Sequence, residues 1–421
     1  MSDTSLICID LSSVDHNMRV LRRIVGPNCA VCPIVKADGY GLGVAPIARR
    51  LVAAGADMLA VYTPQQAAEL ARAAVGGPIL ILMPVREIAR GDEAYRLMIN
   101  GRLHLTVHDN DHLDDLLHLA EYYATLIPVH VDVDTGMSRG GCQPDETPLV
   151  IKRIAESRWL HLAGLSTHFA QADADADAGL TKKQLAMFDA LVQKCASLMP
   201  PDCLIHAANT FATFTHRRFH KSMVRVGQAW AGYGSQWINA GQFRRKTEEL
   251  RPIITWRSHL VQVKTIKRGT SVGYGSTWTA KRRSRIGLVP VGYADGYPTG
   301  LGSTDTNPKP ACVGVVVDPP PAKGAAVRFV PVVGQVNMDQ LTIDLTDLIS
   351  SGGGDAAQVG PGTTVELISP DPAAPNHLPA LAKAAGTIPH ELLCRLNPRI
   401  KRVYDADLIP QPTAPAAVLA G

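Results

Sequence analysis

The chain has few aromatic residues, no long apolar run and no block of like charge. Aromatic residues make up 5% of its 421 residues, and the formal net charge is +4. Surfaces that bind nucleic acid depend on basic patches and on aromatic rings that stack with bases, so nucleic acid is not an expected partner. No stretch approaches the roughly 20 apolar residues that span a bilayer. The N-terminus lacks the basic and apolar regions of a secretory signal. We therefore expect a cytoplasmic protein without a membrane segment.

The cysteines show no spacing typical of a metal site or a disulfide framework. They stand at positions 8, 29, 32, 142, 195, 203, 312 and 394. Cys29 and Cys32 are separated by two residues, but no second pair follows at the spacing of a zinc site. We expect free thiols in a reducing compartment, and no metal site.

Residues 10–245 alternate between short apolar runs and amphipathic helical stretches such as 45–54, 64–74, 113–123 and 182–199. The apolar runs are dominated by Val, Ile and Leu, which is typical of parallel strands covered on both faces. Strands are predicted at 30–36, 58–62, 78–83, 104–108, 128–134, 162–168, 203–208 and 223–227. Strands that alternate with helices in this way predict an α/β fold of the TIM type, a (β/α)8 barrel.

Residues 246–405 have a different composition, with more Val, Thr, Gly and Pro. The pattern predicts a C-terminal, mostly antiparallel β domain. Its expected strands are 260–266, 286–291, 311–317, 327–333 and 363–367, with a proline-rich loop at 318–324, a glycine-rich turn at 351–354 and helices near 379–385 and 390–396. A strand within residues 1–9 is expected to join this domain. Residues 406–421 are expected to form a frayed tail.

A lysine closes the first predicted strand. Lys36 ends the apolar run 31–36, and the glycine-rich segment 37–43 follows directly. A lysine at the end of a buried strand is partly desolvated, so its pKa falls and its amine can attack an aldehyde. Pyridoxal phosphate is the usual aldehyde held in this way. The same segment also fits an ordinary strand end with a solvated lysine.

Other polar residues fall at or near the ends of predicted barrel strands, where the active sites of such barrels lie. They are Asp134, His168, Asn209 and Arg225. The alternative for His168 is a hydrogen-bonded core histidine, and for Arg225 a salt bridge at a strand end.

Several short motifs follow one another along nearly the whole chain. They are Val35-Lys-Ala-Asp-Gly-Tyr-Gly41, Val133-Asp-Thr-Gly-Met-Ser-Arg139, Ser166-Thr-His-Phe-Ala170, His206-Ala-Ala-Asn-Thr210, Val224-Arg-Val-Gly227, Val272-Gly-Tyr-Gly-Ser-Thr-Trp278, Val291-Gly-Tyr-Ala-Asp-Gly-Tyr297 and Val336-Asn-Met-Asp-Gln340. Each motif is weak alone, but together they resemble the alanine racemase family of pyridoxal-phosphate enzymes. The resemblance implies a racemase that interconverts L- and D-alanine. It also implies a homodimer with shared active sites, in which the β domain of one subunit covers the barrel mouth of the other.

The resemblance implies two bases, one on each face of the substrate. Lys36 would carry the cofactor as a Schiff base, and Tyr274 from the other subunit would be the second base. A tyrosine with an ordinary pKa near ~10 is a poor base at pH 7 and needs cationic or hydrogen-bonding neighbours. His168 and Arg225 match the family residues that provide them. Without the resemblance, Tyr274 would fit equally well as a core residue of a β hairpin.

The resemblance also assigns residues around the cofactor. Arg225 would face the pyridine nitrogen and keep it unprotonated, because arginine does not readily give up its proton. His206 and Asn209 would steady Arg225. Arg139 would contact the phenolic oxygen of the cofactor and the substrate carboxylate. A solvated loop arginine is the ordinary alternative for Arg139.

Hydroxyl groups and glycine-rich backbone suit the phosphate of the cofactor. The resemblance places it among Tyr40, Thr210, Gly227 and Gln228. Met338 would offer its backbone N–H to the substrate carboxylate, with Asp339 close by, and Tyr293 would narrow the access to the site. For Met338 and Tyr293 the alternative is core packing.

Two positions depart from the family pattern. Seven positions before Arg139, many members have a carbamylated lysine, and this chain has Asp132. We hypothesise that the Asp132 carboxylate replaces the carbamate. Near the C-terminus, Pro398 stands where many members have a tyrosine near the phosphate. Arg395 or Arg399 could pair with the phosphate instead, or both could point away.

Three other functions fit parts of the sequence. A racemase of broader specificity, acting on serine or larger amino acids, is open because Asn337 and Gln340 are polar and the tyrosine at position 398 is missing. A non-catalytic pyridoxal-phosphate protein would need Lys36 but not Tyr274. A related decarboxylase would need a reactive cysteine and an acidic residue late in the chain, and no such pair is evident.

Overall fold

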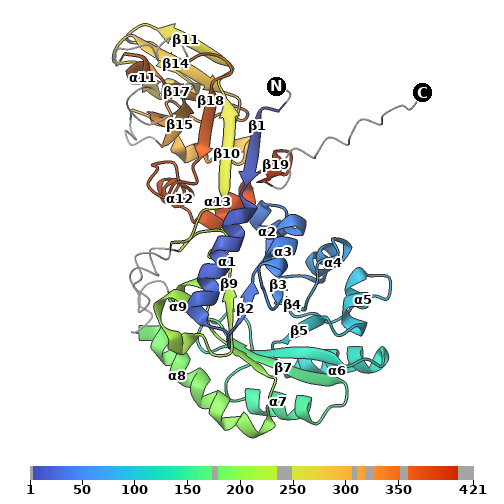
Figure 1. Cartoon of the computed structure of the whole chain (residues 1–421). Helices are drawn as coiled ribbons and strands as arrows, with labels where there is room; N and C mark the ends of the chain where they lie inside the picture. The colour runs from blue at the N-terminus through green and yellow to red at the C-terminus, as the bar shows by residue number, and fades with distance from the viewer. Residues whose placement is uncertain are drawn as a thin grey trace, which may run out of the picture. The chain divides into compact units, whose positions relative to one another are not determined.

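The computed structural model describes residues 3–172, 179–234, 249–305, 311–317, 327–350 and 359–405. The chain forms two compact units (Figure 1). One comprises Ser13–Arg251, and the other comprises Met1–Ser12 together with Pro252–Gly421. The expected loops at 318–324 and 351–354 and the expected tail lie outside the described residues.

Parallel strands form the sheet of the first unit. Within its described residues there are eight, in the order β2-β9-β8-β7-β6-β5-β4-β3. They are β2 Ala30–Pro33, β3 Leu59–Val61, β4 Ile79–Ile81, β5 Leu103–Val107, β6 Ile127–Val133, β7 Leu160–Thr167, β8 Leu204–His206 and β9 Met223–Val226. The two edge strands meet at a parallel bridge between Ile34 and Ala60, and the Val35 N–H donates to the Ala60 carbonyl at 2.8 Å. The sheet is thus nearly closed, and the predicted barrel is confirmed.

Helices lie outside this sheet (Figure 1). They are α1 Leu11–Val25, α3 Val44–Ala53, α4 Pro64–Arg72, α5 Glu93–Ile99, α6 Asn110–Tyr122, α7 Thr147–Ala155, α8 Gly179–Lys194 and α9 Thr210–Thr215, with short 3-10 turns η1 Ala196–Leu198 and η2 Arg217–Phe219. Local signals start them: the Asp109 carboxylate accepts the His112 N–H at 2.7 Å and caps α6. Each loop that leads from a strand to the next helix starts at the carboxyl edge of the sheet, and the candidate site lies at this edge.

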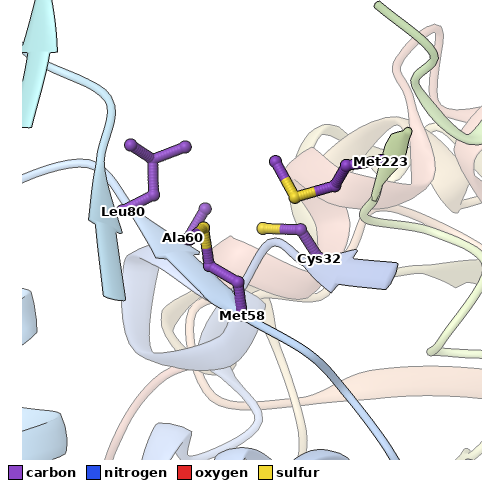
Figure 2. Close-up of a cluster of buried hydrophobic side chains, with 5 residues drawn as sticks. All are labelled: Cys32, Met58, Ala60, Leu80 and Met223. Atoms are coloured by element: carbon purple, nitrogen blue, oxygen red, sulfur yellow. The ribbon is translucent and has the colours of Figure 1, made fainter. Parts of the chain in front are cut away.

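Apolar side chains from β2, β4, β9 and the start of β3 fill part of the barrel interior. Figure 2 shows this cluster of Cys32, Met58, Ala60, Leu80 and Met223. All five are at most 4% exposed. Burial raises the pKa of the Cys32 thiol to about 12, so this cysteine is a neutral core residue.

The second unit is mostly antiparallel. In its described residues, a six-stranded sheet has the order β16-β15-β18-β10-β1-β19, a three-stranded sheet the order β11-β14-β17, and β12 pairs with β13. The strands are β1 Ser5–Ile9, β10 Ile254–His259, β11 Gln262–Ile266, β12 Ser271–Val272, β13 Trp278–Thr279, β14 Ser284–Val289, β15 Cys312–Val316, β16 Val327–Pro331, β17 Leu341–Asp344, β18 Thr364–Ile368 and β19 Lys401–Tyr404. The N-terminal strand β1 lies between β10 and β19 in the larger sheet (Figure 1).

Short helices complete the second unit. They are α11 Thr346–Ser350, α12 Leu378–Ala384 and α13 Pro389–Arg395, with the 3-10 turns η3 Tyr274–Ser276, η4 Tyr293–Asp295 and η5 Thr299–Leu301. Across the described parts of both units, no helix has the length and apolar character needed to cross a membrane.

Candidate active site

Lys36 begins a turn of unusual backbone conformation, the element α2 Lys36–Gly41. Strand β2 ends at Pro33 and not at Lys36 as expected, because residues 37–40 all adopt the left-handed helical region, with φ between 53° and 61°. Each residue other than glycine costs roughly 1–2 kcal/mol there. The Gly39 N–H donates to the Val35 carbonyl at 3.1 Å, and the Asp38 carboxylate accepts the Val44 N–H at 2.7 Å. These bonds hold a strained turn directly after the lysine.

Gly39 is the one glycine among these four left-handed residues, so replacing it tests the turn. A Cβ at this position would lie 3.4 Å from the Val44 Cα, and φ is +61°. We expect Gly39→Ala to lower the free energy of unfolding by about 1–2 kcal/mol. Urea denaturation measures the change. Gly76→Ala, where a Cβ has open space and φ is not left-handed, is the matched control. Equal stability of the two variants would show that the turn is not strained.

Arg225 of β9 is buried in the barrel and is 7% exposed. Its guanidinium donates to the carbonyls of Thr167 at 2.7 Å and His206 at 3.1 Å, and Nη1 lies 2.6 Å from His206 Nδ1. Burial lowers the pKa of Arg225. Among the described residues, no carboxylate lies within ion-pairing distance of it. A salt bridge therefore does not account for this arginine, and backbone carbonyls and imidazole nitrogens fix its direction.

His168 follows β7 and lies beside Arg225. Its Nδ1 is 3.4 Å from Nη2 of Arg225. Burial lowers the pKa of His168 to about 3, and the charges of Arg225, Arg139 and Lys36 add to this effect. His168 is therefore neutral at pH 7. Arg225 contacts His168 directly, and the charges of Arg139 and Lys36 act on its ring as well.

Asp132 of β6 is a buried carboxyl group on which the charges of Arg225 and Arg139 act. It accepts a hydrogen bond from the Ser166 hydroxyl at 2.7 Å. Burial raises the pKa of Asp132, and the Ser166 hydroxyl and the charges of Arg225 and Arg139 only partly offset that effect. A carboxylate in this position attracts the neighbouring guanidinium of Arg139.

The loop that leads to Arg139 is held by Asp134 at the end of β6. The Asp134 carboxylate accepts the backbone N–H groups of Gly136, Met137 and Ser138 at 2.9, 2.8 and 3.0 Å. Burial opposes ionisation of Asp134, but the three donors outweigh it and lower the pKa. Arg139 is thus presented by an ordered turn next to a strand end.

The residues expected around a phosphate lie on three segments, which are α2, the start of α9 and the residues after β9. The Gly227 N–H donates to the Thr210 hydroxyl at 3.2 Å. Tyr40 stacks on Trp230 with ring centroids 5.8 Å apart, and the Gln228 carbonyl accepts the Tyr233 N–H at 3.0 Å. The sequence did not single out Trp230, although it follows Gly227 by three positions.

Asn209 caps a helix at the edge of the site. Its Oδ1 accepts the Ala212 N–H at 3.0 Å and caps α9. An asparagine directly before a helix is a preferred capping residue, and its expected role of steadying Arg225 stays a prediction. His206 does contact Arg225, as expected.

The second unit presents its own group of predicted site residues. Tyr274 is 75% exposed and lies in the 3-10 turn η3. The adjacent Gly273 and Gly275 have φ of 76° and 68°, which glycine adopts without strain. Tyr293 and Met338 are neighbours, since the Tyr293 N–H donates to the Asn337 carbonyl at 3.0 Å. Their exposed fractions of 45% and 55% argue against core packing.

The two C-terminal arginines have carboxylate partners in this unit. Arg399 donates to Asp295 at 2.8 Å and to Asp339 at 3.3 Å. Arg395 pairs with Glu391 at 2.5 Å on α13. The sequence left open whether Arg395 or Arg399 pairs with the phosphate or whether both point away, and these ion pairs favour the second alternative. The contact with Arg399 also orients Asp339.

The donor set of the first unit fits pyridoxal phosphate. It contains the Lys36 amine and the guanidinium groups of Arg139 and Arg225, whose charges act on the neutral His168 imidazole, and a buried carboxyl group on which the two arginines act. Hydroxyl groups of Tyr40 and Thr210 lie in the segments next to it. An anionic phosphate ester with an aldehyde matches this combination of charge and nucleophile.

The comparisons with known proteins agree with this donor set. The model of the alanine racemase N-terminal domain matches residues 9–235, and that of the C-terminal domain matches residues 253–404. The alanine racemase of Halothermothrix orenii is 32% identical over 397 residues, covering 94% of this chain and 95% of the relative. The alanine racemase of Methanococcus maripaludis is 31% identical over 398 residues, covering 94% and 97%.

Solved structures agree as well. Alanine racemase from Streptomyces coelicolor superimposes with a TM-score of 0.79 at 30% identity, covering 95% of this chain and 98% of its own. The Bartonella henselae enzyme, solved with covalently bound pyridoxal phosphate, has a TM-score of 0.75 at 26% identity and covers 95% and 99%. With both domain models matched in order and nearly the full length of these relatives covered, the chain belongs to the alanine racemase family.

Proposed function

We propose that the protein interconverts L-alanine and D-alanine with pyridoxal phosphate, as a cytoplasmic homodimer. The observation that carries the proposal is the buried contact of Arg225 with the neutral His168 at the carboxyl ends of the barrel strands, where the charges of Arg139 and Lys36 also act on His168. The relatives named alanine racemase support the substrate, and the Bartonella henselae enzyme supports the cofactor.

Lys36 and Tyr274 are the proposed bases. When bound, pyridoxal phosphate draws electrons away from the substrate Cα and makes its proton acidic. The Lys36 amine then takes or returns the Cα proton on one face, and the Tyr274 phenol does so on the other. Tyr274 belongs to the second unit, and we propose that a second subunit supplies it. Its exposure in the single chain is consistent with such a role.

Arg225 and His168 would set the charge around the reacting atoms. The guanidinium of Arg225 is fixed by carbonyls and does not give up a proton, so a ring nitrogen facing it stays unprotonated. His168 presents its Nδ1 to Arg225, which leaves a proton on Nε2. In the proposed dimer that N–H would donate to the phenol oxygen of Tyr274 from the second subunit and would make the phenol a better base.

The remaining residues would bind the ends of the cofactor and substrate. Tyr40, Thr210, Gly227 and Gln228 would hold the phosphate. Arg139 and the Met338 backbone N–H would bind the substrate carboxylate, Asp339 would lie nearby, and Tyr293 would narrow the access. A guanidinium that is held by an ordered turn binds a carboxylate in a defined direction.

We expect the charge of Asp132 to orient Arg139 in place of the family's carbamate. Asp132→Asn keeps the shape of the side chain and a hydrogen bond with Ser166 but removes the charge. KM for alanine should rise about tenfold, the equivalent of one weakened charge-assisted bond, while Ser166→Ala should change it less. Steady-state kinetics measures both. Unchanged KM and kcat in Asp132→Asn would remove Asp132 from the site.

The experiment for the proposed function is a substrate panel with the purified holoenzyme. L-alanine should convert to an equal mixture of enantiomers, followed by loss of optical rotation. Serine and larger amino acids should react at least about tenfold more slowly, because the discrimination of one small group in a pocket reaches this size. Equal rates for serine would favour the broader racemase. Bound pyridoxal phosphate without racemisation of any amino acid would favour a non-catalytic carrier.

A further inference from the structure

Three histidines form a hydrogen-bonded row behind Arg225 in the barrel interior. His104 Nδ1 lies 3.0 Å from His130 Nε2, and His130 Nδ1 lies 2.9 Å from His206 Nε2. His206 Nδ1 lies 2.6 Å from Arg225 Nη1. The row therefore connects β5, β6, β8 and β9, and it begins near the amino end of β5. Of its histidines, the sequence had singled out His206 alone.

The row depends on a glycine in the strand that it crosses. β7 lies between β6 and β8, and its Gly164 stands directly beside His130. A Cβ on Gly164 would lie 2.1 Å from His130 Nδ1 and 2.6 Å from its Cε1. The backbone of Gly164 is not in the left-handed region, so the ring and not the backbone requires glycine here. The absent side chain is what lets His130 reach His206 across β7.

Arg225 determines the position of every proton in this row. A guanidinium has only donors, so His206 Nδ1 must accept and the proton of His206 must sit on Nε2. His206 Nε2 then donates to His130 Nδ1, which places the His130 proton on its own Nε2. That nitrogen donates to His104 Nδ1 in turn. Each ring is neutral, and each carries its proton on Nε2.

We propose that His104, His130 and His206 form a one-way hydrogen-bond relay that holds Arg225, with His104 and His130 as positioning residues. The tautomers of the three rings follow from the hydrogen bonds of this chain alone. Only the effect of the relay on catalysis rests on the proposed function, in which Arg225 faces the cofactor. Neutral rings in this order present the lone pair of His206 Nδ1 to Arg225, which fixes its guanidinium together with the carbonyls of Thr167 and His206.

Because every hydrogen bond in the relay points the same way, a second proton on His104 would change the hydrogen bond that Arg225 makes with His206. A second proton on His104 would place an N–H opposite His130 Nε2, and the reversal would pass through His130 to His206. His206 would then point an N–H at the guanidinium. The charged and titratable groups that face the row are Arg225 and His161, which pairs with Asp202 at 3.0 Å. Burial and the charge of His161 lower the pKa of His104 to about 4, so the relay is intact at neutral pH.

The direct test is the tautomer of each ring by 15N NMR of histidine-labelled protein, with and without pyridoxal phosphate. We expect His104, His130 and His206 to carry the proton on Nε2 in both states. In Arg225→Met, which removes the donor that orders the row, the tautomers of His130 and His206 should become mixed, whereas His104→Leu, at the far end, should leave both in place. A proton on Nδ1 of His206 in the wild-type protein would overturn the relay, whatever the racemase activity.

A double-mutant cycle tests the crossing at Gly164. Gly164→Ala and His130→Ala should each lower kcat about tenfold, the equivalent of one lost buried hydrogen bond. In the double variant, Gly164→Ala should add no further loss, because the ring that it displaces is gone. Multiplicative losses in the double variant would contradict the relay. The tautomers are read from the spectra alone, so failure of the proposed function and failure of the relay are distinguishable.

Discussion

Replacing Lys36 with alanine should lower the rate of alanine racemisation by more than about 10³-fold, which is the usual contribution of an acid–base group that touches the reacting atom. Two effects add: the variant loses the amine that moves the proton and the covalent hold on the cofactor. Initial rates of D-alanine formation measure the loss, and visible absorbance of the purified protein reports the retained cofactor.

The matched control is another lysine. Lys152 on α7 is exposed and lies 3.7 Å from Glu156 one turn away, so Lys152→Ala should leave the rate unchanged. Circular dichroism shows whether both variants are folded. A folded Lys36→Ala protein with a rate within tenfold of the wild type would mean that Lys36 is an ordinary strand-end lysine.

The protein should also lose stability steeply as the pH falls below about 6.5, the ordinary pKa of a histidine in an unfolded chain. His130 and His206 are 0% and 1% exposed, and burial holds their pKa values well below that of a free histidine. Between the pKa of the buried histidines and that of unfolded histidines, the unfolded chain binds protons that the folded chain does not. The free energy of unfolding therefore decreases as the pH decreases through this range. Each histidine contributes about 1.4 kcal/mol per pH unit, and the pair about 2.7.

Urea denaturation at several pH values between 8 and 5.5 gives the free energy of unfolding as a function of pH. The test compares the slope of this curve between the wild-type protein and a histidine variant. His130→Gln should reduce the slope by about 1.4 kcal/mol per pH unit, since one buried group no longer titrates. Above pH 7 all the rings are neutral in both states, and their ionisation should add no pH dependence there. An identical slope in the variant would show that His130 takes up its proton as readily in the folded protein as in the unfolded one.

The barrel was predictable from the sequence because its strands are rich in Val, Ile and Leu and alternate with amphipathic helices. Short elements with polar composition were not: β17 and β19 have four residues each and gave no clear pattern. The end of β2 was also misplaced. In the left-handed turn after Lys36, three residues other than glycine, at positions 37, 38 and 40, adopt a conformation that their side chains disfavour.

The candidate site was partly predictable for a related reason. Residues at strand ends can be identified one by one, but their partners depend on which strands are neighbours. His130 contacts His206 only because Gly164 leaves room in the strand between them. Arg399 contacts Asp295, which is 104 positions away in the chain. The cap that Asn209 forms could have been predicted from its place before a helix.

Two bases on opposite faces of the substrate Cα are the core of the proposed mechanism. The most direct test is exchange of the Cα hydrogen of each alanine enantiomer in D₂O, comparing the wild-type holoenzyme with Tyr274→Phe. The wild type should exchange the Cα hydrogen of both enantiomers and racemise both. Tyr274→Phe should retain exchange with one enantiomer only, at the face served by Lys36, with racemisation lost. If the variant still exchanged and racemised both enantiomers, Tyr274 would not be the second base.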